Sequence, residues 1–368
     1  MNAITPARKS DALPEPFRAH GRGAKSNASG RFERTTSEPA DDGWGSMEAP
    51  QGKLRTNLIR DAARTIITRN DSPDISFDQS ANPYRGCEHG CIYCFARPTH
   101  AYWGYSAGLD FESVIFYKPR AADLLAKAFR KPSYSPQVLA LGTNTDPYQP
   151  VERQLSITRS ILKTCTDFAH PVSIITKSAG VLRDLDILSD MAKLGLAHVA
   201  ISVTTLDSKL ARTMEPRAST PARRLKAIEA LSQAGVPTSI FTSPMIPGLN
   251  DHELEKLLEA GAKAGARHAS YVLIRLPLEV EPLFRQWLAI ERPLAARKIM
   301  GLIESTHNGK AYDSAFHARM RGEGPVADLI RARFERACRT NGLSRRVEPL
   351  RTDLFTRPKE ETDQLSLF

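Results

Sequence analysis

The sequence of 368 residues contains no apolar run long enough to cross a bilayer. No apolar stretch follows Arg8 and Lys9, so the N-terminus does not have the pattern of a secretory signal peptide. There are only five cysteines, an odd number, and a disulfide framework is not expected. These absences exclude membrane-spanning and disulfide-rich secreted proteins. We therefore expect a cytoplasmic protein whose cysteines act as ligands or in catalysis.

No glycine-rich GxGxxG turn follows the first strand-like run, which argues against a doubly wound dinucleotide-binding sheet. From about residue 77 onward, β-branched runs alternate with amphipathic helical patterns, as in successive strand-helix units of a parallel sheet. The six candidate strands are 79–84, 137–143, 172–178, 197–205, 237–244 and 268–276, and an added strand is predicted at 113–118. Six units favour an α/β fold with a partial, three-quarter TIM-like barrel. A flat doubly wound sheet is the alternative.

Composition divides the chain into four parts. Residues 1–55 are rich in Gly, Ser, Arg and Pro without a hydrophobic period, which predicts a disordered N-terminal arm. A core domain is expected at 56–284, a basic helical extension at 285–357 and a tail at 358–368. Of the net charge of +10, residues 285–351 supply +7, from 14 basic and 7 acidic side chains. This surplus fits either a solvated face or a nucleic-acid-binding surface.

The segment NPYRGCEHGCIYCFARP, residues 82–98, holds Cys87, Cys91 and Cys94. A c-type haem site needs His directly after the CxxC pair, but Phe95 stands there, so haem is excluded. A thioredoxin-like redox pair leaves the third cysteine unexplained, and structural zinc lacks an obvious fourth ligand. A [4Fe-4S] cluster held by three thiolates would keep one iron open for a substrate or cofactor.

The spacing Cys87-xxx-Cys91-xx-Cys94, with Tyr93 before the last cysteine, resembles the signature of the radical S-adenosylmethionine (SAM) superfamily. The resemblance covers roughly residues 77–276. Within the superfamily the chain is similar to the group related to spore photoproduct lyase, through NPYRGCEHGCIYCFARPTHAY and GTNTDPYQPVE. The resemblance implies a [4Fe-4S] cluster and SAM as cofactors, and an electron donor such as flavodoxin or ferredoxin. It also implies cleavage of SAM to methionine and a 5′-deoxyadenosyl radical that abstracts hydrogen from a substrate.

The resemblance also implies where SAM lies, because polar residues at the carboxyl ends of the strands would surround it. The end of the second strand would contact the amino group, Lys177 and Arg217 the carboxylate, and Ser202 or Thr204 the ribose. The predicted cofactor-binding residues are Tyr93, Thr143, Asn144, Thr145, Asp146, Lys177, Ser202, Thr204 and Arg217. Turn formation and backbone hydrogen bonding are the alternative roles for Asn144, Asp146 and the hydroxyls.

One feature departs from the family pattern. Spore photoproduct lyase uses an additional cysteine near the end of the second strand to donate hydrogen, whereas GTNTDPY here has none. Three functions therefore stay open. They are a radical enzyme that repairs or modifies nucleic acid, the same chemistry on a protein or small molecule, and a non-catalytic iron-sulfur adaptor that binds nucleic acid.

The chain ends in the apolar cluster QLSLF. Gln364, Leu365, Leu367 and Phe368 resemble the pentapeptide by which bacterial replication and repair enzymes attach to the DNA sliding clamp. The alternative is a tail that folds back onto its own domain. On the first interpretation, the partners are the clamp through the tail and nucleic acid through the basic extension.

Overall fold

The computed structural model describes residues 21–33 and 54–358. Its main sheet has seven strands in the order β10-β9-β8-β7-β6-β3-β2, and only β2 (Ile67–Arg69) runs antiparallel to its neighbour. The six parallel strands are β3 (Gln79–Ala81), β6 (Leu139–Leu141), β7 (Val172–Thr176), β8 (Ala197–Ser202), β9 (Thr238–Phe241) and β10 (His268–Ser270). Each lies within one of the six predicted segments. The predicted α/β fold with a parallel sheet is confirmed.

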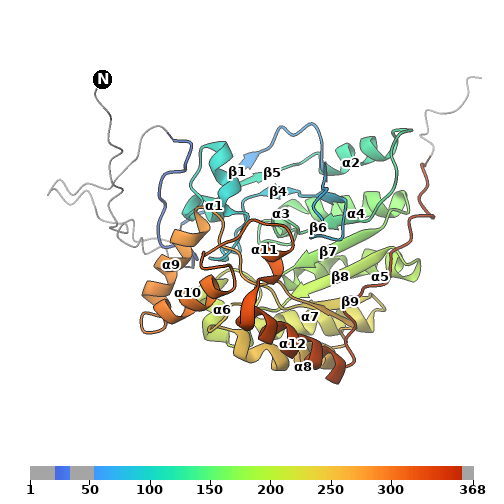
Figure 1. Ribbon diagram of the computed structural model, residues 1–368. Coiled ribbons are helices and arrows are strands. Elements are labelled where there is room, and N and C mark those ends of the chain that lie inside the picture. The colour runs from blue at the N-terminus through green and yellow to red at the C-terminus, as the bar shows by residue number, and fades with distance from the viewer. Residues whose placement is uncertain (1–20, 34–53, 359–368) are drawn as a thin grey trace, which may run out of the picture.

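Helices follow the strands, as the alternating pattern predicts. They are α2 (Ala121–Phe129), α3 (Glu152–Leu155), α4 (Ile157–Asp167), α5 (Leu185–Lys193), α6 (Ser208–Met214), α7 (Pro221–Gln233) and α8 (Leu254–Lys263). Figure 1 shows α7 and α8 stacked below the strands. In β7 the buried Val172 and Ile174 join the main hydrophobic core, whereas Ser173 and Ile175 lie on the opposite face and are partly exposed. This alternation separates a helix-covered face from a second face of the sheet.

A second, three-stranded sheet leads into the cysteine segment. It consists of β1 (Asn57–Arg60), β5 (Val114–Tyr117) and β4 (Tyr84–Arg85), and β5 confirms the added strand predicted at 113–118. The cysteine loop follows β4 directly. It is followed in turn by a 3-10 helix, Arg97–Trp103, and by α1 (Leu109–Ser113). The small sheet therefore fixes the direction in which the loop enters the core.

The C-terminal region consists mainly of helices, as expected. They are α9 (Val280–Glu291), α10 (Ala296–Ser305), α11 (Ala318–Arg321) and α12 (Gly324–Thr340). The predicted boundary between 284 and 285 is wrong, because it falls inside α9. Phe284 and Trp287 of this helix are fully buried in a second core that also contains Ile92 and Tyr93 of the cysteine loop. The extension thus completes the core around the loop.

The expectation of a disordered arm over 1–55 is also wrong for residues 21–33. Arg22, Gly23, Ala24 and Ser26 of this segment are buried against the cysteine loop and α9. We call residues 21–33 the strap. Its low hydrophobicity misleads because backbone N–H groups and a guanidinium, rather than apolar side chains, anchor it.

Two further predictions concern membrane-spanning helices and the C-terminal tail. None of the described helices is both long and apolar enough to span a membrane. The tail residues Gln364, Leu365, Leu367 and Phe368 lie outside the described ranges.

Candidate active site

The cysteine loop is held by backbone hydrogen bonds to elements on both sides. Cys87 N–H donates to the carbonyl of Phe111 at 2.9 Å, and Ile92 N–H donates to the carbonyl of Met214 at 3.0 Å. Gly90 adopts a φ of +67°, and a β-carbon there would lie 2.6 Å from the Glu112 carboxylate. Glycine is therefore required at this turn by both conformation and space.

The three thiols are free, with Cys87 and Cys91 buried and Cys94 partly exposed. Burial raises the pKa of all three, and Asp146, Cys91 and Cys94 add to the rise at Cys87. Within the described residues no three His, Cys, Asp or Glu side chains converge on one point as a single metal ion requires. A four-iron cluster instead takes each thiolate on a different iron.

A buried network lies beneath the loop. The Tyr93 hydroxyl donates to the Glu215 carboxylate, which also accepts a hydrogen bond from Thr204 at 2.7 Å and pairs with Arg224. Burial opposes ionisation of Glu215, but Arg224 and Lys177 together lower its pKa to about 2. Burial, reinforced by Glu215, raises the pKa of Tyr93. The network holds an ionised carboxylate and a neutral phenol next to Cys91.

Three predicted residues meet at the ends of β7 and β8. Lys177 Nζ donates to Ser202 Oγ at 2.8 Å and lies 5.7 Å from the centre of the Tyr93 ring. Ser202 Oγ donates to the carbonyl of Ser243, which follows β9, and Thr204 Oγ1 lies 3.2 Å from the same carbonyl oxygen. The structure therefore brings Tyr93, Lys177, Ser202 and Thr204 together beside the cysteines, in a polar arrangement suited to a charged, hydroxyl-bearing ligand.

The Asp146 carboxylate binds neighbouring groups of the protein. Its carboxylate accepts hydrogen bonds from Thr176 Oγ1 and Lys177 N–H, each at 2.7 Å, and lies 3.3 Å from His89 Nδ1. Burial opposes its ionisation, but His89 and these hydrogen bonds lower its pKa to about 2. Its carboxylate ties the end of β6 to the end of β7 and to the cysteine loop.

The neighbouring predicted residues share this structural character. Thr145 is buried and donates to the carbonyl of Tyr84 at 3.0 Å. Asn144 N–H donates to Asn82, and Thr143 is partly exposed beside it.

Arg217 lies on the outer side of the loop. Its guanidinium pairs with Glu88 at 2.9 Å, and its N–H donates to the carbonyl of His89. Together with His89, Tyr148 and Arg223 it lines a pocket of about 130 Å³. The structure does not bring Arg217 into hydrogen-bonding contact with Lys177, the other residue predicted for the SAM carboxylate.

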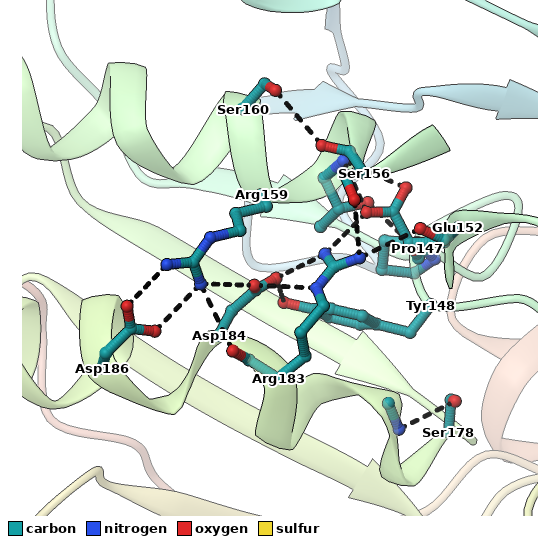
Figure 2. A network of polar contacts seen from close by, with 12 residues as sticks. Pro147, Tyr148, Glu152, Ser156, Arg159, Ser160, Ser178, Arg183, Asp184 and Asp186 are labelled. Carbon is teal, nitrogen blue, oxygen red and sulfur yellow. Dashed lines mark hydrogen bonds and ion pairs between the residues drawn. The ribbon is translucent and has the colours of Figure 1, made fainter. Parts of the chain in front are cut away.

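The motif DPYQPVE supports the loop from below. Gln149 accepts a hydrogen bond from Glu88 N–H at 2.9 Å and donates to the carbonyl of Gly86 at 3.2 Å, while Val151 N–H donates to the Glu88 carboxylate at 2.7 Å. The other end of the motif enters the polar network of Figure 2. There Tyr148 donates to Asp184 at 3.0 Å.

In the same network, Glu152 pairs with Arg183 at 2.7 Å, and Arg159 pairs with both Asp184 and Asp186 (Figure 2). These ion pairs fasten α4 to α5 beneath the site. The motif therefore acts as a frame for the cysteine loop.

A second buried ion pair lies above the loop. Arg97 and Glu112 are both fully buried, 2.5 Å apart. The Glu112 carboxylate also accepts hydrogen bonds from the strap, from Gly23 N–H at 2.9 Å and Ala24 N–H at 2.8 Å. Arg22 donates to the Glu112 carbonyl and to that of Leu54. The backbone N–H groups of the strap thus bind the Glu112 carboxylate at positions that Arg97 does not occupy.

Sequence reasoning missed the four charged residues of these two pairs, Arg97, Glu112, Glu215 and Arg224. Isolated Glu and Arg residues are usually exposed, and no spacing rule marks those that pair inside a core. The only sequence signal is their position next to the cysteine motif and the following helices.

The sequence model of the radical SAM superfamily matches residues 81–261. An uncharacterised protein of Mycobacterium tuberculosis is 36% identical over 221 residues, which are 60% of this chain and 65% of that protein. An uncharacterised protein of Methanocaldococcus jannaschii is 30% identical over 199 residues, which are 54% of this chain and 71% of that protein. The chain belongs to the radical SAM superfamily. Its match spans just under two thirds of the mycobacterial relative.

Solved structures share the fold. A spore photoproduct lyase complexed with dinucleoside spore photoproduct superposes with a TM-score of 0.57 and 15% identity, over 78% of this chain and 81% of that chain. A variant of that lyase with bound AdoMet and the same dinucleoside gives a TM-score of 0.54 over the same shares. The cofactors of this superfamily are a [4Fe-4S] cluster and SAM.

The residues present fit these cofactors. Cys87, Cys91 and Cys94 supply three free thiols on one loop, which is the ligand set of a cluster with one open iron. Lys177 and Ser202 place a cation and a hydroxyl beside them. Both kinds of group suit the carboxylate and ribose of SAM.

Proposed function

We propose that this chain is a radical SAM enzyme that cleaves SAM reductively and abstracts hydrogen from a nucleic-acid substrate. The observation that carries the proposal is the meeting of three free thiols with Tyr93 and Lys177 at the carboxyl ends of the strands. Cys87, Cys91 and Cys94 hold the cluster, which when bound supplies the electron for cleavage. Lys177 orients the carboxylate, and Ser202 or Thr204 binds the ribose.

The basic character of the chain supports a nucleic-acid substrate, because its net charge is +10. Part of that charge is already neutralised. Six arginines of the C-terminal region pair with carboxylates of this chain: Arg285, Arg319, Arg331, Arg333, Arg345 and Arg351. This pairing favours, as a second candidate, the same chemistry on a protein or small molecule.

The reaction need not be thymine-dimer reversal with a cysteine as hydrogen donor. The end of β6 carries no thiol, and Cys165 and Cys338 are buried in the main core. Tyr148, the nearest phenol on that segment, is also committed, since it donates to Asp184.

Attachment to the DNA sliding clamp remains a proposal carried by the terminal residues Gln364, Leu365, Leu367 and Phe368. Calorimetric titration of the clamp with a peptide of residues 357–368 should release binding heat. No heat, where a known clamp peptide binds, would remove this partner.

The proposed chemistry is tested by anaerobic reconstitution with iron and sulfide, followed by dithionite and SAM. The wild-type chain should release 5′-deoxyadenosine, and a variant with Cys87, Cys91 and Cys94 all replaced by Ala should release none. Deuterated oligonucleotides and a deuterated acidic protein extract then separate the two substrate classes, because only the true substrate transfers deuterium into 5′-deoxyadenosine. No 5′-deoxyadenosine from an iron-loaded wild-type chain would contradict the proposal.

A further inference from the structure

An exposed aromatic ring stands next to the third cysteine. Phe95 follows Cys94 directly, and 41% of its surface is exposed. The guanidinium carbon of Arg275 lies 4.1 Å from the centre of its ring. Arg275 follows β10 on a segment that still pairs with the chain after β9, through Leu273 and Met245. The stack therefore lies at the same edge of the sheet as Lys177 and Ser202.

Arg275 has unused binding capacity. Among the described residues, no hydrogen-bond acceptor or carboxylate pairs with its guanidinium, although the side chain is only partly exposed. Burial lowers the pKa of Arg275, whereas Tyr312, Cys94 and Asp74 act to raise it, and Asp74 is already bonded to Arg319 and His317. A half-buried arginine without an anion normally gains one from a ligand, because desolvating an unpaired charge is costly.

A second stack of the same kind lies nearby. Phe316 is 55% exposed, and the guanidinium carbon of Arg319 lies 4.7 Å from its ring centre. Leu273 N–H donates to the carbonyl of Met320 at 2.9 Å, which fixes this segment beside Arg275. Arg319 acts electrostatically on Arg275. Two exposed rings, each with a guanidinium over it, are thus linked through Arg275, and the Phe95 ring directly follows Cys94.

We propose that these two stacks form a binding site for an unpaired nucleotide of single-stranded or locally opened nucleic acid. The base stacks on the exposed surface of Phe95, and the phosphate pairs with Arg275. The exposed ring of Phe316 receives the adjoining base, while Arg319, bonded to Asp74, holds that ring in place. Any nucleic-acid base can stack on an aromatic ring and on an arginine plane. An acidic peptide, in contrast, would be bound by the arginine charge alone and would have no use for the exposed ring. This inference rests on the proposed function and assigns the substrate's position in the same site.

The test is fluorescence anisotropy with the reconstituted full-length chain and labelled single-stranded oligothymidylate, its duplex and a polyglutamate peptide. Phe95→Leu keeps apolar bulk but removes the ring, and Arg275→Gln removes the charge. Each should weaken single-strand binding by about 10-fold. Arg275→Lys should recover only part of the affinity, because lysine cannot stack as a plane. The matched control Arg297→Gln, which removes an exposed charge on α10, should change affinity less than about two-fold.

Three results would overturn the site. The first is a wild-type chain that does not bind the single strand. The second is affinity of Phe95→Leu and Arg275→Gln equal to that of Arg297→Gln. The third is loss of polyglutamate binding in Arg275→Gln with no effect of Phe95→Leu on any probe, which would indicate a plain anion site. Because binding is measured without SAM cleavage, a chain that forms 5′-deoxyadenosine but shows any of these results loses this site and keeps its proposed chemistry.

Discussion

Two buried ion pairs hold the cysteine loop from opposite sides. They differ in which residues donate the remaining hydrogen bonds to the carboxylate of each pair. The Glu215 carboxylate pairs with Arg224 and also accepts hydrogen bonds from Tyr93 and Thr204. All four residues lie within the span matched by the superfamily. Glu112 and its partner Arg97 lie in the same span, but the remaining acceptor positions of Glu112 are filled by the strap, which lies outside it. One side of the loop is therefore supported from within the matched span, and the other also by a segment outside it.

The largest effect is expected from Glu215→Gln. The substitution leaves the buried Arg224 without its counter-charge and should lower the free energy of unfolding by about 3–5 kcal/mol. Urea denaturation of the metal-free protein measures this. Glu112→Gln should cost less, because Arg97 keeps three backbone carbonyl acceptors, those of Cys91, Ala107 and Gly108, whereas Arg224 keeps two. An equal or larger loss for Glu112→Gln would reverse the ranking of the two sides.

The same pair predicts a pH dependence. The pKa of Glu215 falls from 4.5 to about 2 on folding, so its contribution is complete above pH 4.5 and is lost as the pH falls towards about 2. Over this window Glu215→Gln should lose less stability than the wild type. Parallel acid-unfolding curves for the two proteins would contradict the assignment.

The strap is tested by truncation. Deleting residues 1–26 removes the donors to Glu112 and should cost about 1–3 kcal/mol. It should also speed the reaction of the loop thiols with a thiol reagent in the metal-free protein. Deleting residues 1–20 is the control, because it leaves Arg22, Gly23 and Ala24 in place. Identical thiol reactivity in both truncations would show that the strap does not protect the loop.

A single substitution in the strap, Gly23→Ala, tests the same contact between the strap and the cysteine loop. A β-carbon at Gly23 would lie 1.9 Å from the carbonyl oxygen of Gly90, so Gly23→Ala must displace the strap. Its cost should not exceed that of the truncation to residue 26. Gly30→Ala is the matched control, since no neighbouring atom lies closer than 3.4 Å to its β-carbon. Differential scanning fluorimetry compares the two, and equal melting temperatures would argue against the close contact.

The smallest effect is expected from Tyr93→Phe. Glu215 keeps its bonds to Thr204 and Arg224, so the loss of one hydrogen bond to the carboxylate should cost about 1.5 kcal/mol. Urea denaturation measures it. A loss as large as that of Glu215→Gln would mean that the phenol, rather than the arginine, dominates this side.

Much of the fold could be predicted from the sequence, and the reasons are local. Hydrophobic period and β-branched runs located all six parallel strands, because these strands are largely buried: β6 and β8 are buried along their whole length, and β7 buries alternate residues. Cysteine spacing predicted the family. Polar residues at strand ends predicted the meeting of Lys177 with Ser202, since parallel strands end at one edge.

The remaining features depend on tertiary contacts that leave no periodic trace. The strap is polar and glycine-rich, and only the buried Glu112 carboxylate reveals why it is ordered. The core around Trp287 joins α9 to the loop across a boundary that charge composition placed at residue 285. The role of Asp146 in tying β6 to β7 could not be distinguished from cofactor contact by sequence alone.

The central claim is that Cys87, Cys91 and Cys94 hold a cluster whose open iron binds SAM. Electron paramagnetic resonance of the anaerobically reconstituted, dithionite-reduced chain, recorded before and after addition of SAM, tests it most directly. We expect a [4Fe-4S] signal whose shape changes when SAM is added. A chain that binds zinc instead of iron and sulfide, or a cluster signal that SAM leaves unchanged, would contradict it.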